Sequence, residues 1–163
     1  MSQVRGAAHA TANEVFSVAE LVTEAARAAG YDATSRGCAF NVAEVDPFLG
    51  VSGNRAKILA ALANVLQNAF KFTHARTAVG LTTHSNGVRI FIEVSDHCGG
   101  LPHGATEAMF RPFKQSGEDR SGLGLGLSIA RRGVEADGGT LTARDIPGAG
   151  CVFTIELPQQ ALH

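Results

Sequence analysis

The sequence predicts an α+β fold, a two-layer sandwich with helices on one face of a mixed sheet. Two kinds of periodicity lead to this prediction. Apolar residues recur at helical spacing between residues 54 and 72. Between residues 87 and 95 apolar and polar residues alternate, as in a strand with one covered face. Two more strands are expected at residues 140–145 and 151–157, which complete the sheet.

The first elements follow from local signals. A helical pattern begins directly after Ser17 and is expected to end near Gly30. A strand is expected at residues 38–45, which Asp46-Pro47 breaks. These two elements precede the longest helix of the chain.

That longest helix is expected from Asn54, as the N-cap, to about Phe72. A strand at residues 77–83 follows, and a turn-like segment connects it to the strand at residues 87–95. Regular periodicity is then lost from residue 96 to 121 apart from a short segment at 105–113, and such a stretch within a domain is typical of a functional loop or lid. A final helix is expected from about Leu123 to Ala136.

Composition limits the class of protein. With 163 residues the chain is long enough for one domain, expected at 14–160 after a disordered leader at 1–13. The net charge of −1 gives no basis for binding nucleic acid, and no apolar segment predicts direct membrane contact. We expect a cytoplasmic domain, monomeric in isolation, whose parent protein could be membrane-anchored through another part.

The three cysteines form no C-x-x-C pair, which argues against a disulfide framework or a zinc site. They are Cys38, Cys98 and Cys151.

A glycine-rich segment precedes the last helix. Residues 121–128 read S-G-L-G-L-G-L-S, with Gly122, Gly124 and Gly126 alternating with leucines. Glycines let the backbone approach a ligand closely, and the helix dipole adds attraction for an anion. The segment is therefore a candidate phosphate-binding loop, although glycine alternation also occurs at strand ends and tight turns.

Two further groups of polar residues carry chemistry. Asn64, Asn68 and Lys71 share one face of the long helix. Amide oxygens can coordinate magnesium and the lysine can bind phosphate. Such a polar stripe along a helix is, however, usually a solvated face. Asp96 ends an apolar strand and can accept a hydrogen bond from an exocyclic amine such as that of adenine, while Gly99 and the next glycine leave room for a flat ring. Aspartate before glycines also occurs in simple turns.

The order of these groups strongly resembles the catalytic, ATP-binding domain of sensor histidine kinases, in the wider superfamily of gyrase, chaperone and mismatch-repair ATPases. Residues 64–73 look like the family's asparagine box, residues 96–101 its first glycine box, residues 109–113 its phenylalanine box, and residues 122–127 its second glycine box. The resemblance covers residues 16–158.

The resemblance implies a Bergerat-type ATP site with Mg²⁺. Asp96 would bind adenine, Asn68 would be the main magnesium ligand, and Asn64 and Lys71 would lie near the phosphates. The second glycine box would wrap the triphosphate, and Phe110 and Phe113 would anchor a mobile lid. The other residues expected at the nucleotide are Gly100, Gly122, Leu123, Gly124, Leu125, Gly126 and Leu127.

The resemblance also suggests a reaction. Hydrolysing relatives have a glutamate, resembling a general base, where this chain has Asn64, and an amide cannot take a proton from water. The site is therefore expected to hold ATP for an outside nucleophile, with Asn64, Lys71 and Lys114 in the catalytic set. Many family members have an arginine after the last box phenylalanine. Lys114 or Arg120 is expected to replace it here.

Cys98 departs from the glycine that is usual in the first glycine box, and we expect it to fill a gap as a small apolar residue. The six histidines show no metal spacing and no phospho-acceptor pattern, and are interpreted as surface or loop residues. The acceptor would thus lie on a separate helical dimerisation domain, with a response regulator downstream. Alternatives are a regulatory ATP-binding module without transfer and a serine kinase of the anti-sigma type on the same fold. A dinucleotide-binding Rossmann domain is disfavoured, because the glycine run does not follow a first strand.

Overall fold

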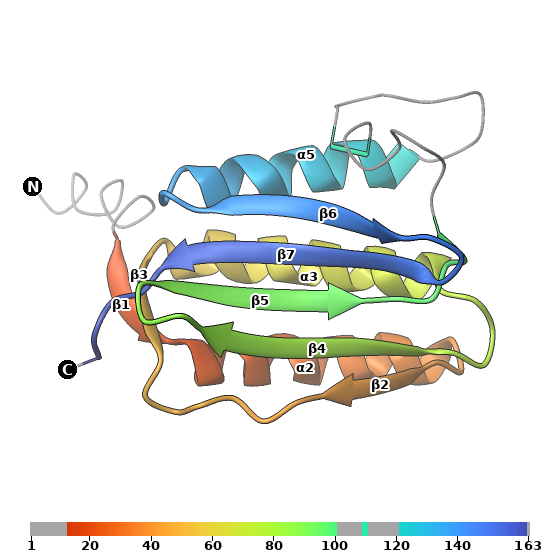
Figure 1. Cartoon of the computed structure of the whole chain (residues 1–163), viewed down its shortest axis with the longest axis horizontal. Helices are drawn as coiled ribbons and strands as arrows, with labels where there is room; N and C mark the ends of the chain where they lie inside the picture. The colour runs from red at the N-terminus through yellow and green to blue at the C-terminus, as the bar shows by residue number, and fades with distance from the viewer. Residues whose placement is uncertain (1–12, 101–108, 111–120, 163) are drawn as a thin grey trace, which may run out of the picture.

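The computed structural model describes residues 13–100, 109–110 and 121–162, with the side chains of 121–125 excepted. Helices and strands alternate irregularly along the chain (Figure 1). The elements are β1 (Glu14–Ser17), α2 (Val18–Ser35), β2 (Ala39–Val42), β3 (Gly50–Gly53), α3 (Arg55–Phe72), β4 (Ala78–Ser85), β5 (Arg89–Ser95), α5 (Ser121–Glu135), β6 (Thr140–Ile146) and β7 (Gly150–Pro158).

The main sheet has five strands in the order β2-β4-β5-β7-β6. The pair β2 and β4 is parallel and the other neighbours are antiparallel, so the sheet is mixed. The helices α2, α3 and α5 lie side by side behind this sheet, with α3 in the middle (Figure 1). The predicted two-layer α+β sandwich, with helices on one face, is therefore confirmed. A second, two-stranded sheet pairs β1 with β3.

Both long helices begin at the N-caps that their sequences provide. The Ser17 hydroxyl accepts a hydrogen bond from the Glu20 N–H at 3.1 Å, and the Asn54 side chain accepts one from the Lys57 N–H at 3.1 Å. Each cap satisfies one of the N–H groups that have no partner in the first helical turn. The predicted start and end of the helix after Asn54 are confirmed.

Helix α2 runs past Gly30, where the sequence predicted its end, and that prediction is wrong. The helix ends instead before Gly37, which has φ +66°. The Gly37 N–H donates to the Thr34 carbonyl at 3.1 Å, and the Cys38 N–H donates to the Ala33 carbonyl at 2.9 Å. This pair of bonds is a Schellman motif, which a glycine in the left-handed region supports.

The core lies between the sheet and the helices. In β5, Ile90, Ile92 and Val94 have no exposed side-chain surface, as the alternation predicted. Val88, the first apolar residue of the same pattern, precedes the strand and is 70% exposed. The short strands β1 and β3 were not predicted, since four residues carry too little periodicity to identify a strand.

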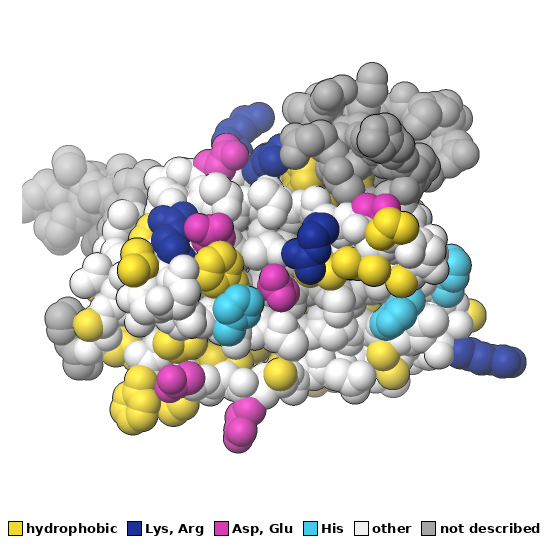
Figure 2. Space-filling view, viewed as in Figure 1, with side chains coloured by type: hydrophobic (Ala, Val, Ile, Leu, Met, Phe, Trp, Pro, Cys, Tyr) yellow, Lys and Arg dark blue, Asp and Glu magenta, His cyan; other side chains and the backbone are white. Residues whose placement is uncertain are grey.

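The opposite face of the sheet is open. Figure 2 shows basic, acidic and histidine side chains dispersed over it with apolar groups between them. Arg89 and Glu156 form an ion pair across β5 and β7 at 2.8 Å, and the ring of His84 stacks on Phe91 with centroids 4.9 Å apart. None of the helices among the described residues is both long and apolar enough to cross a bilayer.

Candidate functional site

Helix α3 carries the predicted amide stripe. Asn68 is buried, Asn64 is half-buried and Lys71 is exposed, so the stripe leads from the interior to the surface. The Asn68 Nδ2 donates to the backbone carbonyl of Asn64 at 3.2 Å. This bond uses the donor end of the amide and directs the remaining function of the side chain to its oxygen, Oδ1. The Lys71 ammonium lies 5.5 Å from the Phe72 ring centroid.

Helix α5 packs along α3, and a glycine of α5 faces the amide stripe. A Cβ placed on Gly126 would lie 3.2 Å from the Asn64 Oδ1, which is tighter than ordinary side-chain contacts. The absence of a side chain at Gly126 thus lets the backbone of α5 reach the amide of Asn64. The asparagine stripe and the glycine-rich segment are therefore neighbours in space, as the sequence predicted.

The glycine-rich segment is not a loop that precedes the helix. Helix α5 already begins at Ser121, so Gly122, Gly124 and Gly126 belong to its first two turns. The expected start at about Leu123 is thus slightly late. The N–H groups of the first turn of a helix have no partner within the helix and point along its axis, where they attract anions. The backbone of residues 121–124 therefore offers the donors that were assigned to a glycine loop. Leu123 and Leu125 lie in the same turns.

Asp96 follows the last residue of β5 and is 7% exposed. Its Oδ1 accepts two backbone hydrogen bonds, from the Cys98 N–H at 3.2 Å and from the Cys151 N–H at 3.1 Å. Desolvation by burial raises the pKa of this carboxyl above its ordinary value, while these hydrogen bonds act in the opposite direction. The two amides fix the orientation of the carboxylate.

Gly99 and Gly100 both have positive φ, at +91° and +95°. A Cβ at Gly99 would lie 2.8 Å from the His74 ring, and one at Gly100 would lie 2.9 Å from the Gly148 backbone nitrogen. The two glycines thus serve a tight loop that packs on its neighbours. The expectation that they also leave room for a flat ring stays a prediction.

A polar contact that the sequence did not reveal joins α3 to the Asp96 loop. The Thr73 hydroxyl, at the end of α3, accepts the His97 N–H at 3.0 Å and is 2.8 Å from the Thr77 hydroxyl. His97 is the residue next to Asp96. Thr73 therefore fixes the distance between the carboxylate and the amide stripe. Only the folded structure places Thr73 beside a residue so far along the chain.

Two residues predicted at the nucleotide have buried side chains. Leu127 has no exposed surface, and Phe110 is 4% exposed with its ring edge-on to Phe153 at 6.5 Å. Both side chains pack in the core, which suits the predicted role of Phe110 as an anchor. The expected place of the two residues at the nucleotide stays a prediction. Phe113, Lys114 and Arg120 lie outside the described residues.

Two of the cysteines, Cys98 and Cys151, lie close to the Asp96 carboxylate. Cys98 is half-buried and packs against the core, as expected of a residue that fills a gap. Burial raises the pKa of the Cys98 thiol, and burial together with the Asp96 charge raises the pKa of Cys151 to about 12. Cys151 contributes its backbone N–H to the site, and Cys98 contributes its N–H together with its thiol, which also lowers the pKa of Asp96. The described histidines are exposed, as predicted; they are His74, His84 and His97.

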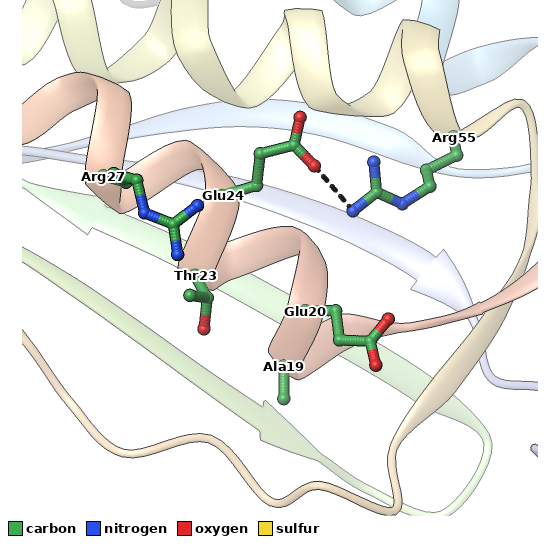
Figure 3. A pocket seen from close by; sticks show the side chains of 6 residues that line it. All are labelled: Ala19, Glu20, Thr23, Glu24, Arg27 and Arg55. Carbon is green, nitrogen blue, oxygen red and sulfur yellow. Dashed lines mark ion pairs between the residues drawn. The ribbon is translucent and has the colours of Figure 1, made fainter.

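One surface pocket lies on α2 and the start of α3 (Figure 3). Two acidic and two basic side chains line it, and the Arg55–Glu24 ion pair at 2.9 Å closes one side. It contains none of the predicted site residues and offers no surplus of positive charge for phosphate. Its lining residues are Ala19, Glu20, Thr23, Glu24, Arg27 and Arg55.

The described residues thus form a site with two chemically different ends. One end is a buried carboxylate held by backbone amides, suited to an exocyclic amine or another donor. The other is an amide-bearing helix packed against a helix N-terminus, suited to phosphate and a hard cation. No cluster of three or more His, Cys, Asp or Glu side chains that could hold a metal occurs among the described residues.

The chain is similar to known proteins in sequence and in fold. The family model of histidine kinase-, DNA gyrase B- and HSP90-like ATPases matches residues 53–161. The sensor protein KdpD of Escherichia coli (strain K12) is 38% identical over 101 residues, which are 61% of this chain and 11% of KdpD. The chain therefore spans only about a tenth of the length of this relative.

Solved structures extend the similarity to the whole fold. The catalytic domain of histidine kinase ThkA superimposes with a TM-score of 0.80 at 26% identity, over 90% of this chain and 95% of that domain. Full-length ShkA in complex with AMPPNP superimposes with a TM-score of 0.79 at 27% identity, over 93% of this chain and 32% of ShkA.

Proposed function

The chain belongs to the family of histidine kinase-, DNA gyrase B- and HSP90-like ATPases, and on that premise we propose that it binds Mg-ATP and donates the γ-phosphate to a histidine of a separate helical dimerisation domain. The catalytic unit is the domain at residues 14–160. The proposal is supported by the two ends of the candidate site and by the AMPPNP bound in the complex of ShkA.

The adenine end is assigned to Asp96. Its Oδ1 already holds the two backbone N–H groups of Cys98 and Cys151. We therefore assign the other oxygen, Oδ2, to the exocyclic amine of adenine. A carboxylate cannot donate a hydrogen bond, so it accepts from the adenine amine and disfavours the carbonyl that guanine presents at the corresponding position.

The phosphate end is assigned to Asn64, Asn68, Lys71 and the first turn of α5. The donor set fits magnesium, because the Asn68 amide gives its N–H to a backbone carbonyl and keeps its oxygen as a hard ligand. When bound, Mg²⁺ would neutralise charge on the phosphates during transfer. Lys71, and Lys114 in the undescribed segment, would place positive charge near the phosphates.

One observation supports transfer over hydrolysis. Helix α3, which the structure describes in full, carries no aspartate or glutamate from Arg55 to Phe72. An amide at Asn64 cannot accept a proton from an attacking water. The helix that would line the phosphates therefore lacks a general base for hydrolysis, and the γ-phosphate is kept for an outside nucleophile.

Two partners follow from this chemistry. The nucleophile would be the imidazole of the dimerisation domain, on the same natural polypeptide or in trans. A response regulator would then receive the phosphoryl group. ThkA has been solved in complex with a response regulator protein, TrrA, which supports a response regulator as one of the partners.

The test uses ATP labelled at the γ-phosphate, this domain and a separately produced dimerisation domain. Acid-labile label on that domain, absent when its histidine is replaced by glutamine, is the expected result. Acid-stable label would instead indicate a serine kinase. Tight nucleotide binding without transfer to the dimerisation domain would indicate a regulatory module and would contradict the kinase proposal.

A further inference from the structure

Arg131 on α5 is outside every predicted motif, yet it joins three elements beside the candidate site. Its guanidinium carbon lies 4.3 Å from the ring centroid of Phe110, which is buried. Its Nε donates to the Leu141 carbonyl in β6 at 3.1 Å and lies 3.8 Å from a Glu135 carboxylate oxygen. One side chain thus connects α5, β6 and the Phe110 ring.

These contacts require an arginine. A guanidinium is planar, so it can stack on the Phe110 ring while its edge donates to the Leu141 carbonyl. A lysine ammonium has the same charge but no planar group and no Nε at that position. The Phe110 ring in turn meets Phe153 of β7 edge-on, so the stack extends from the surface of α5 into the core.

Position along α5 links Arg131 to the phosphate end of the site. Arg131 lies five residues after Gly126, about 7.5 Å along the helix axis. A Cβ at Gly126 would lie 3.2 Å from the Asn64 Oδ1 of α3, and the first turn of the same helix carries the N–H groups assigned to phosphate. A helix moves largely as a rigid body, so the contacts of Arg131 with β6 and Phe110 help to set where its N-terminus points.

The adenine end does not share this dependence. Asp96 is held by the N–H groups of Cys98 and Cys151, and its loop is tied to α3 through Thr73. None of these bonds involves α5. A small displacement of α5 would therefore alter the phosphate end and leave the carboxylate in place.

Resting on the proposed function, we infer that Arg131 is a positioning residue that holds α5 in the orientation needed to bind the triphosphate. It acts through Phe110 and β6 and does not touch the nucleotide. Replacement of Arg131 should weaken binding of the phosphates and leave binding of the adenine group nearly unchanged.

The experiment compares Arg131→Met with Arg132→Met, which removes the same charge from the exposed adjacent position. Affinity for adenosine is measured by NMR titration and affinity for Mg-ATP by calorimetry. In Arg131→Met we expect adenosine affinity within twofold of wild type and Mg-ATP affinity reduced about tenfold or more, since small misplacement of binding groups has large effects. Arg132→Met should leave both affinities unchanged. Equal losses for both ligands in Arg131→Met, or no loss, would overturn the inference.

Arg131→Lys distinguishes geometry from charge, and it covers the case in which Arg131→Met does not fold. Thermal unfolding monitors the fold of each variant. We expect Arg131→Lys to keep the loss in Mg-ATP affinity, whereas full recovery would show that charge alone matters and would refute the positioning role. Wild-type protein that binds neither ligand would contradict the proposed function itself. Wild-type binding with no separation in the variants would contradict only the role of Arg131.

Discussion

Gly126 of α5 faces the side-chain amide of Asn64 in α3 so closely that a Cβ at this glycine would be 3.2 Å from the amide oxygen. The two residues are 62 positions apart in the sequence. Their proximity places the amide stripe next to the helix N-terminus. It also makes the geometry of the phosphate end sensitive to a single methyl group.

Gly126→Ala should therefore weaken Mg-ATP binding. The new methyl group must displace the Asn64 amide by a few tenths of an ångström or shift α5, and we expect about a tenfold loss, equivalent to about 1.4 kcal/mol. Calorimetry measures the affinity. Gly133→Ala is the matched control, because a Cβ there would make only ordinary contact, 3.7 Å from the Lys57 Cβ. That control should bind normally and gain about 0.5–1 kcal/mol of stability, since glycine is unfavourable within a helix. Normal binding by Gly126→Ala would contradict the importance of the contact.

Asp96→Asn should raise the stability of the fold and reduce its selectivity for adenine. Because the pKa of Asp96 is raised in the folded protein, its contribution to stability is greatest at low pH and is lost as pH rises through the folded-state pKa. At pH 7 the buried carboxylate thus lowers the free energy of unfolding. The amide oxygen of asparagine can still accept the N–H groups of Cys98 and Cys151.

We therefore expect Asp96→Asn without nucleotide to unfold at a higher temperature than wild type at pH 7, and the difference to shrink on acidification. The same variant should lose its preference for ATP over GTP by about tenfold or more, because the amide can present a donor to the base. Unfolding curves over a pH series and competition binding measure the two effects. Retained preference for ATP would argue against the assignment of Asp96 to adenine.

Asn68→Ala should remove the dependence of ATP binding on magnesium. The variant loses the amide oxygen proposed as metal ligand and the hydrogen bond from Nδ2 to the Asn64 carbonyl. Loss of that bond should lower the free energy of unfolding by about 1 kcal/mol. ATP affinity is measured with Mg²⁺ and with EDTA. Gln67→Ala, on the exposed side of α3, serves as the control. A full magnesium effect in Asn68→Ala would exclude this residue as the ligand.

Asn64→Glu should increase ATP hydrolysis, since it supplies the proton acceptor that α3 lacks. General-base catalysis contributes about 10²–10⁴-fold in favourable geometry, so a rise of about tenfold is a modest expectation. Release of inorganic phosphate is the measurement. Asn64→Gln has nearly the same shape without the base and should not hydrolyse faster than wild type. Equal rates in the two variants would mean that the missing base is not what limits hydrolysis.

Much of the fold could be predicted because its strongest signals are local. Asn54 as a cap and the apolar face of α3 specify that helix, and the alternation in β5 specifies its buried face. The end of α2 could not be read from Gly30, because a glycine with open space around it is tolerated within a helix, while the true stop depends on the positive φ of Gly37.

The candidate site was predicted as motifs but not as contacts. Asp96 and the asparagines could be named from their residue types and order. The backbone N–H of Cys151 could not be named in advance. Cys151 is 55 positions from Asp96 in the sequence, and only the pairing of strands brings the two residues together. The proposed role of Arg131 could not be predicted either, since an arginine in a helix usually lies on a solvated surface. The burial of Leu127 likewise could not be predicted, because proximity in sequence to a glycine motif does not indicate where a side chain points.

The order of strands has a consequence for biosynthesis. β7 is the last strand along the chain, yet it lies between β5 and β6, and its Cys151 supplies an N–H to Asp96. While a ribosome is still translating the segment before residue 150, β5 has one unpaired edge and β6 has no neighbour in the sheet. A nascent chain therefore cannot complete the hydrogen bonds of Asp96 early, and during elongation it exposes strand edges of the kind that chaperones protect.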